Sequence, residues 1–477
     1  MRKSHLFIAL LVLTNTILSA QTKGTIESQI DAMFSKYNSS TPGVAVSVVK
    51  DGKIILKKGY GMATLEYDIP ITPSTVFHVA SVSKQFTAFA IYLLEQQGKI
   101  SLDDDIRKYL PEVPVFEKPI TIRHLCSHTS GLRDQWALMT LAGWRMDDVI
   151  TTDQILKLVN SQKALNSTPG TQFKYNNTGF TLLAEIIKRV SGQTFAAYTK
   201  RYIFEPLGMT NSQFYDDNDR VVKNRAYSYS EENDIYKKKN LNYSTVGPTS
   251  LMTTVEDLSK WVLNFENPIV GDRELIKKFN EVSLLDNGEP VLYTVVEGEK
   301  IYHAKGQFFR NYRGLDLFNH TGHDAGFQTY IARFPDKHLS VIVLSNDDSF
   351  RSLKSGLDIA ELYLKDDLKK KNVAKATVQN EKAKPSDNLN TNLKDFEGTF
   401  YCNEITATYD LKIENGKLII SHKRLSDTPL TLIDKDTFSG KIEFAVEIAF
   451  IRDNSKSITG FKVSNFGVDN LKFDKVK

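Results

Sequence analysis

The sequence predicts an α+β protein in which a large domain of strands and helices precedes a small all-β domain. Two β-rich runs lie before residue 60, helical patterns dominate from residue 86 to about residue 207, and strand-like runs return after residue 328. Strands at both ends of a domain, with helices between them, favour one sheet built from the two ends of that domain. The last part of the chain alternates apolar and polar residues throughout, which is typical of a small sandwich or barrel.

The composition is that of an ordinary globular protein, with 41% hydrophobic and 25% charged residues. A chain of 477 residues is long enough for two or three domains. Its formal net charge of +4 is too small and too evenly spread to favour nucleic acid as a partner.

Residues 1–20 resemble a secretory signal peptide. Arg2 and Lys3 precede an apolar run over residues 6–13, and Leu18-Ser19-Ala20 offers small residues for cleavage. The run is shorter than the ~20 apolar residues that span a bilayer, so we expect no transmembrane segment after cleavage. The protein is therefore expected in the periplasm or outside the cell.

The large domain is expected over residues 25–365. Its first strands, at residues 44–49 and 54–56, enclose Asp51-Gly52, a dipeptide typical of a β-hairpin turn. Strand-like runs at residues 328–334 and 339–344 come late, and residues 353–364 have the pattern of a closing helix.

Residues 366–391 are rich in Lys, Asp, Asn, Ala and Ser, which indicates a solvated linker. Residues 392–477 are expected to form an all-β domain, since Tyr409, Leu411 and Ile413 alternate before the turn dipeptide Asn415-Gly416. We expect this domain to fold by itself and to be dispensable for chemistry on small esters. Cys126 and Cys402 lie far apart, in different predicted domains, so stability should come from a conventional core rather than from a disulfide.

Ser81 and Lys84 carry the first chemical motif. They precede a run of apolar residues with helical spacing that Gly98 would end, so Ser81 is expected at a helix start. Two residues three apart share one helix face, which places the lysine amine beside the serine hydroxyl. A lysine whose pKa is lowered by burial can take the proton of such a hydroxyl. By itself the pattern also fits a helix-capping serine with a solvated lysine.

Three other clusters stand out in the large domain. Tyr175-Asn176-Asn177 lies in a loop before a helix, where a phenol and an amide can point in one direction. His320-Thr321-Gly322-His323 begins a β region, where a glycine admits a substrate backbone and N–H groups can bind an oxyanion. His124 and His128 have the spacing of metal ligands, but without a nearby acidic partner in sequence a buried structural turn is favoured.

These motifs resemble the class C β-lactamase and penicillin-recognising serine hydrolase family, in order and in approximate spacing. Further family-like phrases are residues 124–132, 205–209 and 253–258. The resemblance covers about residues 42–346 and implies an antiparallel sheet flanked by helices, with an all-helical subdomain beside it and the site between them. The tail resembles the lipocalin-like β-barrel modules that are appended to some members.

The resemblance also implies a role for each motif residue. Ser81 would be the acylated nucleophile, Lys84 its base or orienter, and Tyr175 a proton carrier that donates to the leaving group. Asn177 would hold a substrate amide. The third motif would bind substrate, and the backbone N–H groups of Ser81 and His323 would form the oxyanion hole. No metal or organic cofactor is implied. The residues expected to bind substrate are Asn177, His320, Thr321, Gly322 and His323.

His320 departs from the β-lactamase pattern, which has a lysine at that position. A permanently cationic lysine attracts the carboxylate of a penicillin, whereas a histidine does so only when it is protonated. The leading hypothesis is therefore an exported serine hydrolase that cleaves an ester or amide, including a D-amino-acid peptide bond. Two alternatives are a weak β-lactamase and a penicillin-binding-like protein that acylates slowly and mainly binds peptidoglycan.

Overall fold

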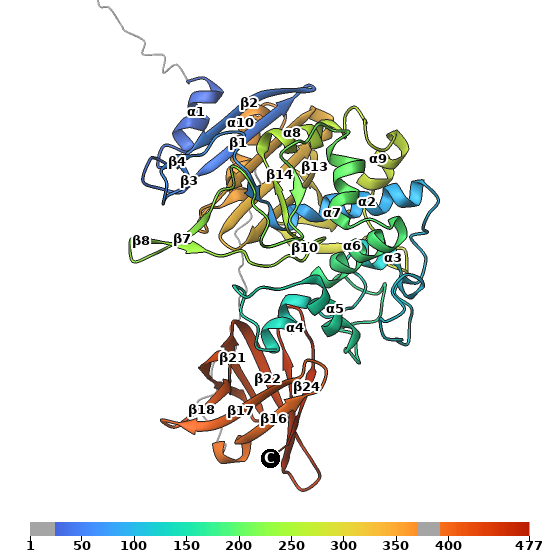
Figure 1. The fold of residues 1–477 in the computed structure, drawn as a ribbon, viewed down its shortest axis with the longest axis vertical. Helices are drawn as coiled ribbons and strands as arrows, with labels where there is room; N and C mark the ends of the chain where they lie inside the picture. Colours follow the sequence, from blue (N-terminus) through green and yellow to red (C-terminus); the bar gives the residue numbers. More distant parts are fainter. Residues whose placement is uncertain (1–23, 371–391, 477) are drawn as a thin grey trace, which may run out of the picture.

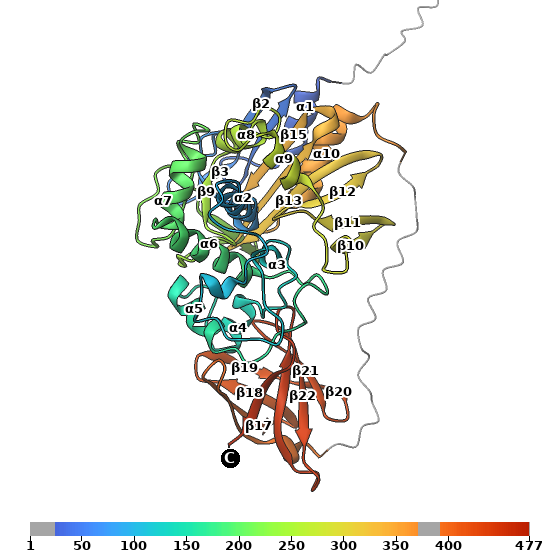
Figure 2. The same cartoon turned by 90° about the vertical axis from the view of Figure 1, so that its right-hand side faces the viewer.

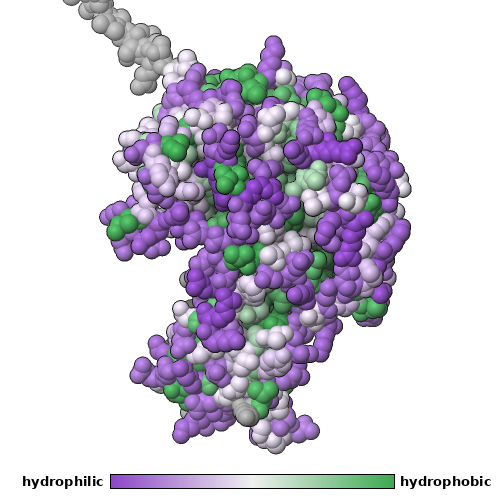
Figure 3. Space-filling view, in the orientation of Figure 1, coloured by the Kyte–Doolittle hydropathy of each residue, from purple (hydrophilic) through white to green (hydrophobic). Residues whose placement is uncertain are grey.

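The computed structural model describes residues 24–370 and 392–476, which form a large α/β part and a smaller β barrel at the C-terminal end (Figure 1). Hydrophilic residues cover most of the face seen in Figure 3, and hydrophobic residues on it are scattered singly or in small groups. The predicted signal peptide and most of the predicted linker lie outside the described residues. Among the described residues, no helix is both long and apolar enough to cross a bilayer.

An eight-stranded antiparallel sheet forms the centre of the large part. Its strand order is β10-β11-β12-β13-β14-β15-β1-β2. The strands are β1 (Val44–Lys50), β2 (Lys53–Tyr60), β10 (Leu292–Val296), β11 (Glu299–His303), β12 (Phe308–Tyr312), β13 (Leu315–Asp324), β14 (Phe327–Phe334) and β15 (Leu339–Ser345).

The two ends of the large part meet in this sheet, as the sequence predicts. Strand β1 pairs with β15, with Val44 opposite Ser345 and Lys50 opposite Leu339. Between β1 and β2 the turn residue Asp51 has φ 50° and is followed by Gly52, which gives the positive φ values of the favoured hairpin turn.

Helices cover both faces of the sheet because its central strands are apolar on both sides. In β1, Val44, Val46 and Val48 pack with α1 (Ile26–Met33) and α10 (Ser352–Leu364). The alternate residues face the opposite layer, where Ser47 is hydrogen-bonded to Ser259 of α8 (Val255–Leu263), with 2.8 Å between the hydroxyl oxygens. The period of two along a strand produces this division between the faces.

Helix α2 (Ser83–Gln96) lies in the middle of the second layer (Figure 2). Every residue from Ser83 to Leu94 is buried, as expected for a helix surrounded by other elements. It ends before Gly98, whose φ of 68° fits the predicted stop. The other helices of this part are α3 (Ile122–Cys126), α4 (Gln135–Leu141), α5 (Thr152–Asn160), α6 (Asn177–Ser191), α7 (Phe195–Thr199) and α9 (Arg273–Asn280).

Short elements connect the sheet to the helices. The short strands are β3 (Met62–Thr64), β4 (Ile69–Pro70), β5 (Phe77–His78), β6 (Gln213–Phe214), β7 (Ser228–Glu232), β8 (Ile235–Lys239) and β9 (Leu251–Thr253). The single helical turns are η1 (Ala80–Val82), η2 (Ile106–Lys108), η3 (Lys200–Phe204), η4 (Pro335–Lys337) and η5 (Leu393–Phe396). The α+β fold class predicted from the sequence is confirmed.

The C-terminal part is a nearly closed barrel of nine antiparallel strands, in the order β19-β18-β17-β16-β24-β23-β22-β21-β20. Aromatic side chains, among them Phe400, Phe450, Phe461 and Phe473, fill its interior. The strands are β16 (Gly398–Cys402), β17 (Ala407–Glu414), β18 (Lys417–His422), β19 (Leu425–Pro429), β20 (Thr431–Asp434), β21 (Thr437–Ile442), β22 (Phe444–Arg452), β23 (Ile458–Ser464) and β24 (Leu471–Lys475).

The barrel core continues into the large part through helix α4, which lies above the barrel in Figure 2. Ala137, Leu138 and Leu141 of α4 belong to the same hydrophobic cluster as the barrel interior. The phenol of Tyr409 donates a hydrogen bond to the carbonyl of Leu141, with 3.1 Å between the oxygens. The barrel therefore packs directly against the large part, and its ability to fold by itself stays a prediction.

Two details of the predicted elements differ from the structure. Ser81 lies in the turn η1 immediately before α2 rather than in the helix itself. The motif that starts at His320 does not begin a β region, because it occupies the second half of the long strand β13.

Cys126 and Cys402 are both buried free thiols.

Candidate active site

Ser81 is presented at the junction of strand β5 and helix α2. The preceding residue, Ala80, has φ 48°, a left-handed conformation that costs energy for any residue other than glycine. Ser81 remains partly exposed, whereas its neighbours Ala80 and Val82 are buried. The turn therefore brings the serine hydroxyl to the surface of an otherwise buried segment.

Lys84 lies beside this hydroxyl, as the spacing predicts. Its Nζ is 3.1 Å from Ser81 Oγ, 2.8 Å from Asn177 Oδ1 and 2.8 Å from the carbonyl oxygen of Pro248. The side chain is completely buried. Burial lowers the pKa of Lys84 to about 7, although the carboxylates of Asp134 and Asp324 partly oppose that shift. A substantial fraction of Lys84 is therefore an uncharged amine at neutral pH.

Tyr175 approaches the serine from the other side. Its phenol donates a hydrogen bond to Ser81 Oγ, with 2.9 Å between the oxygens. Burial raises the pKa of Tyr175, so the group is a neutral phenol at physiological pH. Its ring stacks on His128 at 4.4 Å between centroids. Tyr175 and Asn176 precede helix α6 as predicted, and Asn176 caps it by accepting from the N–H of Gly179, whereas Asn177 is the first residue of the helix itself.

Asp134 is a site residue that the motif search missed. Its Oδ2 accepts hydrogen bonds from the backbone N–H of Asn177 at 2.6 Å and from the side-chain amide of Asn177 at 2.9 Å. These bonds orient the Asn177 amide so that Oδ1 points at Lys84. Asp134 follows the family-like phrase of residues 124–132 by two positions, which is the sequence signal that could have identified it.

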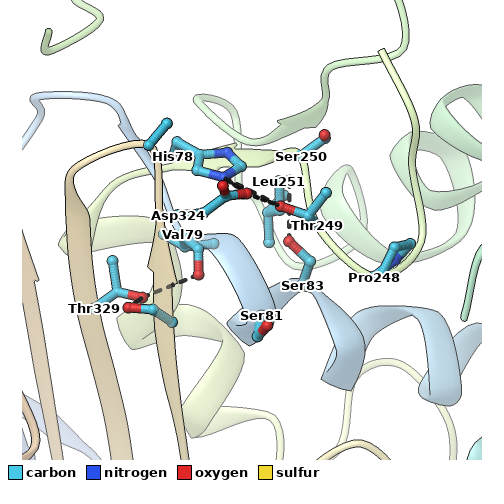
Figure 4. A network of polar contacts seen from close by, with 12 residues as sticks. His78, Val79, Ser81, Ser83, Pro248, Thr249, Ser250, Leu251, Asp324 and Thr329 are labelled. Atoms are coloured by element: carbon cyan, nitrogen blue, oxygen red, sulfur yellow. Dashed lines mark hydrogen bonds and ion pairs between the residues drawn. The ribbon is translucent and has the colours of Figure 1, made fainter. Parts of the chain in front are cut away.

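Gly322 brings strand β13 close to the serine turn. A Cβ at this position would lie 2.3 Å from the carbonyl oxygen of Val79 and 2.3 Å from Thr329 Oγ1. The Thr329 hydroxyl also donates to the Val79 carbonyl at 3.0 Å (Figure 4). The glycine therefore allows the turn that carries Ser81 to pack against strand β13. The sequence had suggested only that it would admit a substrate.

His320 is buried and neutral. Its Nδ1 donates to the carbonyl of Thr321 at 2.5 Å, so Nε2 is a hydrogen-bond acceptor, and among the described residues nothing donates to it. Burial, together with the nearby Lys84 charge, lowers the pKa of His320 to about 3. The imidazole is 2% exposed. The expectation that protonated His320 attracts a carboxylate is therefore not supported near neutral pH.

The remaining residues of the third motif differ in accessibility. Thr321 is half-buried, and the side chain of His323 is largely exposed and is hydrogen-bonded to Asp348, with 2.9 Å between Nε2 and the carboxylate. Strand β13 then ends at Asp324, which forms a network with His78 and Thr249 at 3.1 and 3.0 Å (Figure 4). Burial favours a higher pKa for Asp324, but the bonds from His78 and other donors lower it overall.

His124 and His128 have structural contacts. His124 Nδ1 accepts from the N–H of Thr121 in a capping box, and its Nε2 is 3.0 Å from Asp286, which is distant in sequence. His128 Nδ1 accepts from the N–H of Asn176 at 3.0 Å. These bonds support the structural interpretation of the motif. Within residues 24–370 and 392–476, no cluster of three or more His, Cys, Asp or Glu side chains is suited to a metal ion.

The arrangement is suited to nucleophilic chemistry. A serine hydroxyl contacts an amine whose pKa is lowered to about 7 and a neutral phenol within one cluster. The structure therefore brings together Ser81, Lys84, Tyr175 and Asn177, with strand β13 alongside.

Comparisons with known proteins extend these observations. A family model described as Beta-lactamase matches residues 30–363. Protein flp of Staphylococcus aureus (strain MRSA252) is 28% identical over 316 residues, which cover 65% of this chain and 60% of that protein. A D-aminopeptidase of Gluconobacter oxydans (strain 621H) is 26% identical over 338 residues, which cover 70% of this chain and 61% of that protein. The matches thus span about three fifths of the length of these relatives.

Among solved structures, the octameric penicillin-binding protein homologue from Pyrococcus abyssi has the same fold, with a TM-score of 0.64. The two sequences are 24% identical, and the superposition covers 94% of this chain and 99% of the other. The likeness therefore includes the C-terminal barrel as well as the large part.

Proposed function

The chain belongs to the beta-lactamase family of serine hydrolases, and we propose that it is an exported enzyme that cleaves an ester or amide bond through an acyl-enzyme on Ser81. The observation that carries this proposal is the double contact of Ser81 Oγ with Lys84 Nζ at 3.1 Å and with Tyr175 Oη at 2.9 Å. Export is part of the proposal and rests on the pattern of residues 1–20.

Lys84 is suited to act as the general base because of its two other partners. A neutral amine has two N–H groups and one lone pair. The oxygens of Asn177 and Pro248 accept the two N–H groups, so the lone pair of the uncharged amine faces Ser81 Oγ. Burial provides the low pKa that such a base needs at neutral pH.

Acylation then proceeds with balanced proton transfers. Ser81 Oγ attacks the substrate carbonyl carbon as its proton moves to Lys84 Nζ. The oxyanion is bound by the backbone N–H groups of Ser81 and His323. Tyr175, kept protonated by its raised pKa, gives its proton to the leaving oxygen or nitrogen and recovers one from Lys84. Water then hydrolyses the ester on Ser81 by the reverse proton path.

The proposed substrate class is an ester or an amide, including a D-amino-acid peptide bond. The relative from Gluconobacter oxydans is a D-aminopeptidase, and the buried neutral His320 lacks the positive charge that favours a penicillin carboxylate. Peptidoglycan fragments are one source of such D-peptides.

The test of the proposal uses three probes on the purified protein: an activated ester, a D-alanine anilide and a labelled penicillin. Turnover of the ester or the anilide with weak penicillin labelling supports the proposal. Rapid penicillin turnover would replace it by the β-lactamase alternative, and stable penicillin labelling without turnover would replace it by the penicillin-binding alternative. Lack of reaction with every probe would overturn all three.

Lys84 predicts the pH dependence of the reaction. Because its pKa is lowered to about 7, the amine is protonated and inactive as a base below that pH and uncharged above it. We expect kcat/KM for a neutral ester to rise between about pH 6 and 8 and then to level off. A rate that continues to rise through pH 9 or 10 would show that the lysine has an ordinary pKa and would remove it as the neutral base.

Because His320 is buried and neutral, we expect that the preference between an anionic and a neutral substrate does not change with pH. Since burial lowers its pKa to about 3, the imidazole stays neutral from pH 8.5 to 5.5. We expect the ratio of acylation rates for a penicillin and a neutral ester to remain constant over this range. In His320→Lys, this ratio should be higher than in the wild type at every pH in the range, because the new cation attracts the penicillin carboxylate. A wild-type ratio that rises as the pH falls would show that His320 titrates and binds the anion.

A further inference from the structure

The C-terminal barrel contacts the segment at Asp134, whose carboxylate is hydrogen-bonded to the Asn177 side chain that contacts Lys84. Its loop between β23 and β24 includes Gly467, whose carbonyl accepts a hydrogen bond from the backbone N–H of Asp134 at 2.8 Å. We propose that this loop is a positioning element of the active site, which acts on Lys84 through Asp134 and Asn177. The inference rests on the proposed role of Lys84 as the base.

Four consecutive groups form the connection. The Gly467 carbonyl holds the backbone of Asp134, and the Asp134 carboxylate accepts two hydrogen bonds from Asn177. Asn177 Oδ1 in turn accepts from Lys84 Nζ at 2.8 Å. Asp134 is completely buried and Asn177 is 9% exposed, so water has little access to replace either group. The position of the lysine amine therefore depends on where the barrel loop holds Asp134.

Gly467 fits closely against this turn. A Cβ at Gly467 would lie 2.5 Å from Asp134 Cβ and 3.2 Å from Ala137 Cβ. Neither of these atoms is the end of a flexible side chain, so a methyl group at position 467 has to displace the Asp134 backbone or the loop. The absence of a side chain at this position is thus required by the contact with the catalytic part.

Polar side chains hold the loop in place. Asn166 donates from its amide to the Gly467 carbonyl at 2.9 Å and accepts from the N–H of Asp469 at 2.8 Å. Lys174, the neighbour of Tyr175, forms an ion pair with Asp469.

The residue before Asp134 anchors the same turn to the barrel. The Arg133 guanidinium, whose side chain is 3% exposed, pairs with Glu404 at 2.8 Å. It also donates to the carbonyl of Asp469 at 3.2 Å. Replacing either partner of so buried a pair would leave an uncompensated charge in the docked arrangement.

The first test is Gly467→Ala in the full-length protein. A displacement of about 1 Å at a catalytic group costs on the order of 10²-fold in rate, so we expect kcat to fall about 10- to 100-fold with little change in KM. A shifted Asp134 carboxylate also stabilises the Lys84 cation less, so the acid limb of the pH profile should move to lower pH. Asn166→Ala, which loosens the loop without a steric clash, should change kcat and the acid limb in the same directions.

The acid limb of the pH profile could also reflect the titration of other groups near Lys84. These groups are Asp134, Asp324, Tyr175, and the imidazoles of His128, His303 and His320. The imidazoles have lowered pKa values and the phenol a raised one, so none of them changes charge near pH 7. Asp134→Asn provides the reference for a lost carboxylate and should move the acid limb in the same direction as Gly467→Ala.

Arg424→Ala is the matched control. Arg424 also joins the barrel to the large part, because its guanidinium pairs with Asp148 at 2.7 Å, but it is separate from the loop that holds Asp134. This variant should keep both kcat and the acid limb, and thermal melting should show that all variants are folded. An active wild type with unchanged kinetics in Gly467→Ala and Asn166→Ala would overturn the inference. An inactive wild type would instead contradict the proposed function.

Discussion

Replacement of Ser81 by alanine is expected to abolish formation of the acyl-enzyme while the protein remains folded. The hydroxyl is the group that both Lys84 and Tyr175 contact, so its removal would leave the proposed base and acid without a nucleophile. Ser81 is partly exposed, and loss of its hydroxyl should cost little stability. Mass spectrometry after incubation with an activated ester should show a covalent adduct on the wild type and none on the variant.

Ser83→Ala is a control from the same motif. Figure 4 shows the Ser83 hydroxyl directed toward Leu251, whose backbone N–H donates to it at 3.1 Å. Its loss leaves a buried N–H unpaired, which costs about 1–3 kcal/mol of stability, but it should leave the adduct intact. An adduct that persists in Ser81→Ala, at the same site in the chain, would remove Ser81 from the mechanism.

Removing the base or the acid is expected to reduce turnover by about 10²–10⁴-fold each. Lys84→Met retains the buried volume and removes the amine, and Tyr175→Phe removes only the phenol. In the proposed acylation, Lys84 takes the proton of Ser81 and returns one to Tyr175, and both groups contact Ser81 Oγ, so they would serve one proton path. The double variant should therefore lose much less than the product of the two single losses. Single-turnover rates with the activated ester measure the effect on acylation directly.

Lys305→Met separates this effect from the general cost of removing a buried lysine. Burial also lowers the pKa of Lys305, to about 8, but its amine pairs with the carbonyl of Glu281 rather than with Ser81. This variant should retain acylation if it is folded. If the Lys84→Met and Tyr175→Phe losses multiply in the double variant, the two residues act independently and the shared proton path is wrong.

The local parts of the site could be predicted from short stretches of sequence. Ser81 and Lys84 are adjacent because three residues make about one helical turn, whatever surrounds them. The hairpin at Asp51-Gly52 and the loop before α6 follow from turn and capping residues in the same way. The family resemblance then predicted the fold class and the association of the motifs.

Strands β10 and β11 could hardly be predicted from the sequence. Their side chains are mostly exposed or half-buried, so they do not have the alternating apolar pattern by which a strand is recognised. Strand β10 is the edge strand of the sheet and β11 is its neighbour, so the two strands lie at the end of the sheet away from β1 and β15.

The charge of the site and its connection to the barrel depend on packing between distant segments, so they could not be predicted from the sequence. The pKa values of Lys84 and His320 are lowered mainly by burial, and segments distant in the sequence bury them. From the sequence alone, a histidine is expected to titrate near its ordinary pKa of ~6.5. Asp134 contacts the site only when Asn177 and the Gly467 loop pack against it in the folded protein. Desolvation and long-range hydrogen bonds depend on three-dimensional packing, and residue spacing along the chain does not record them.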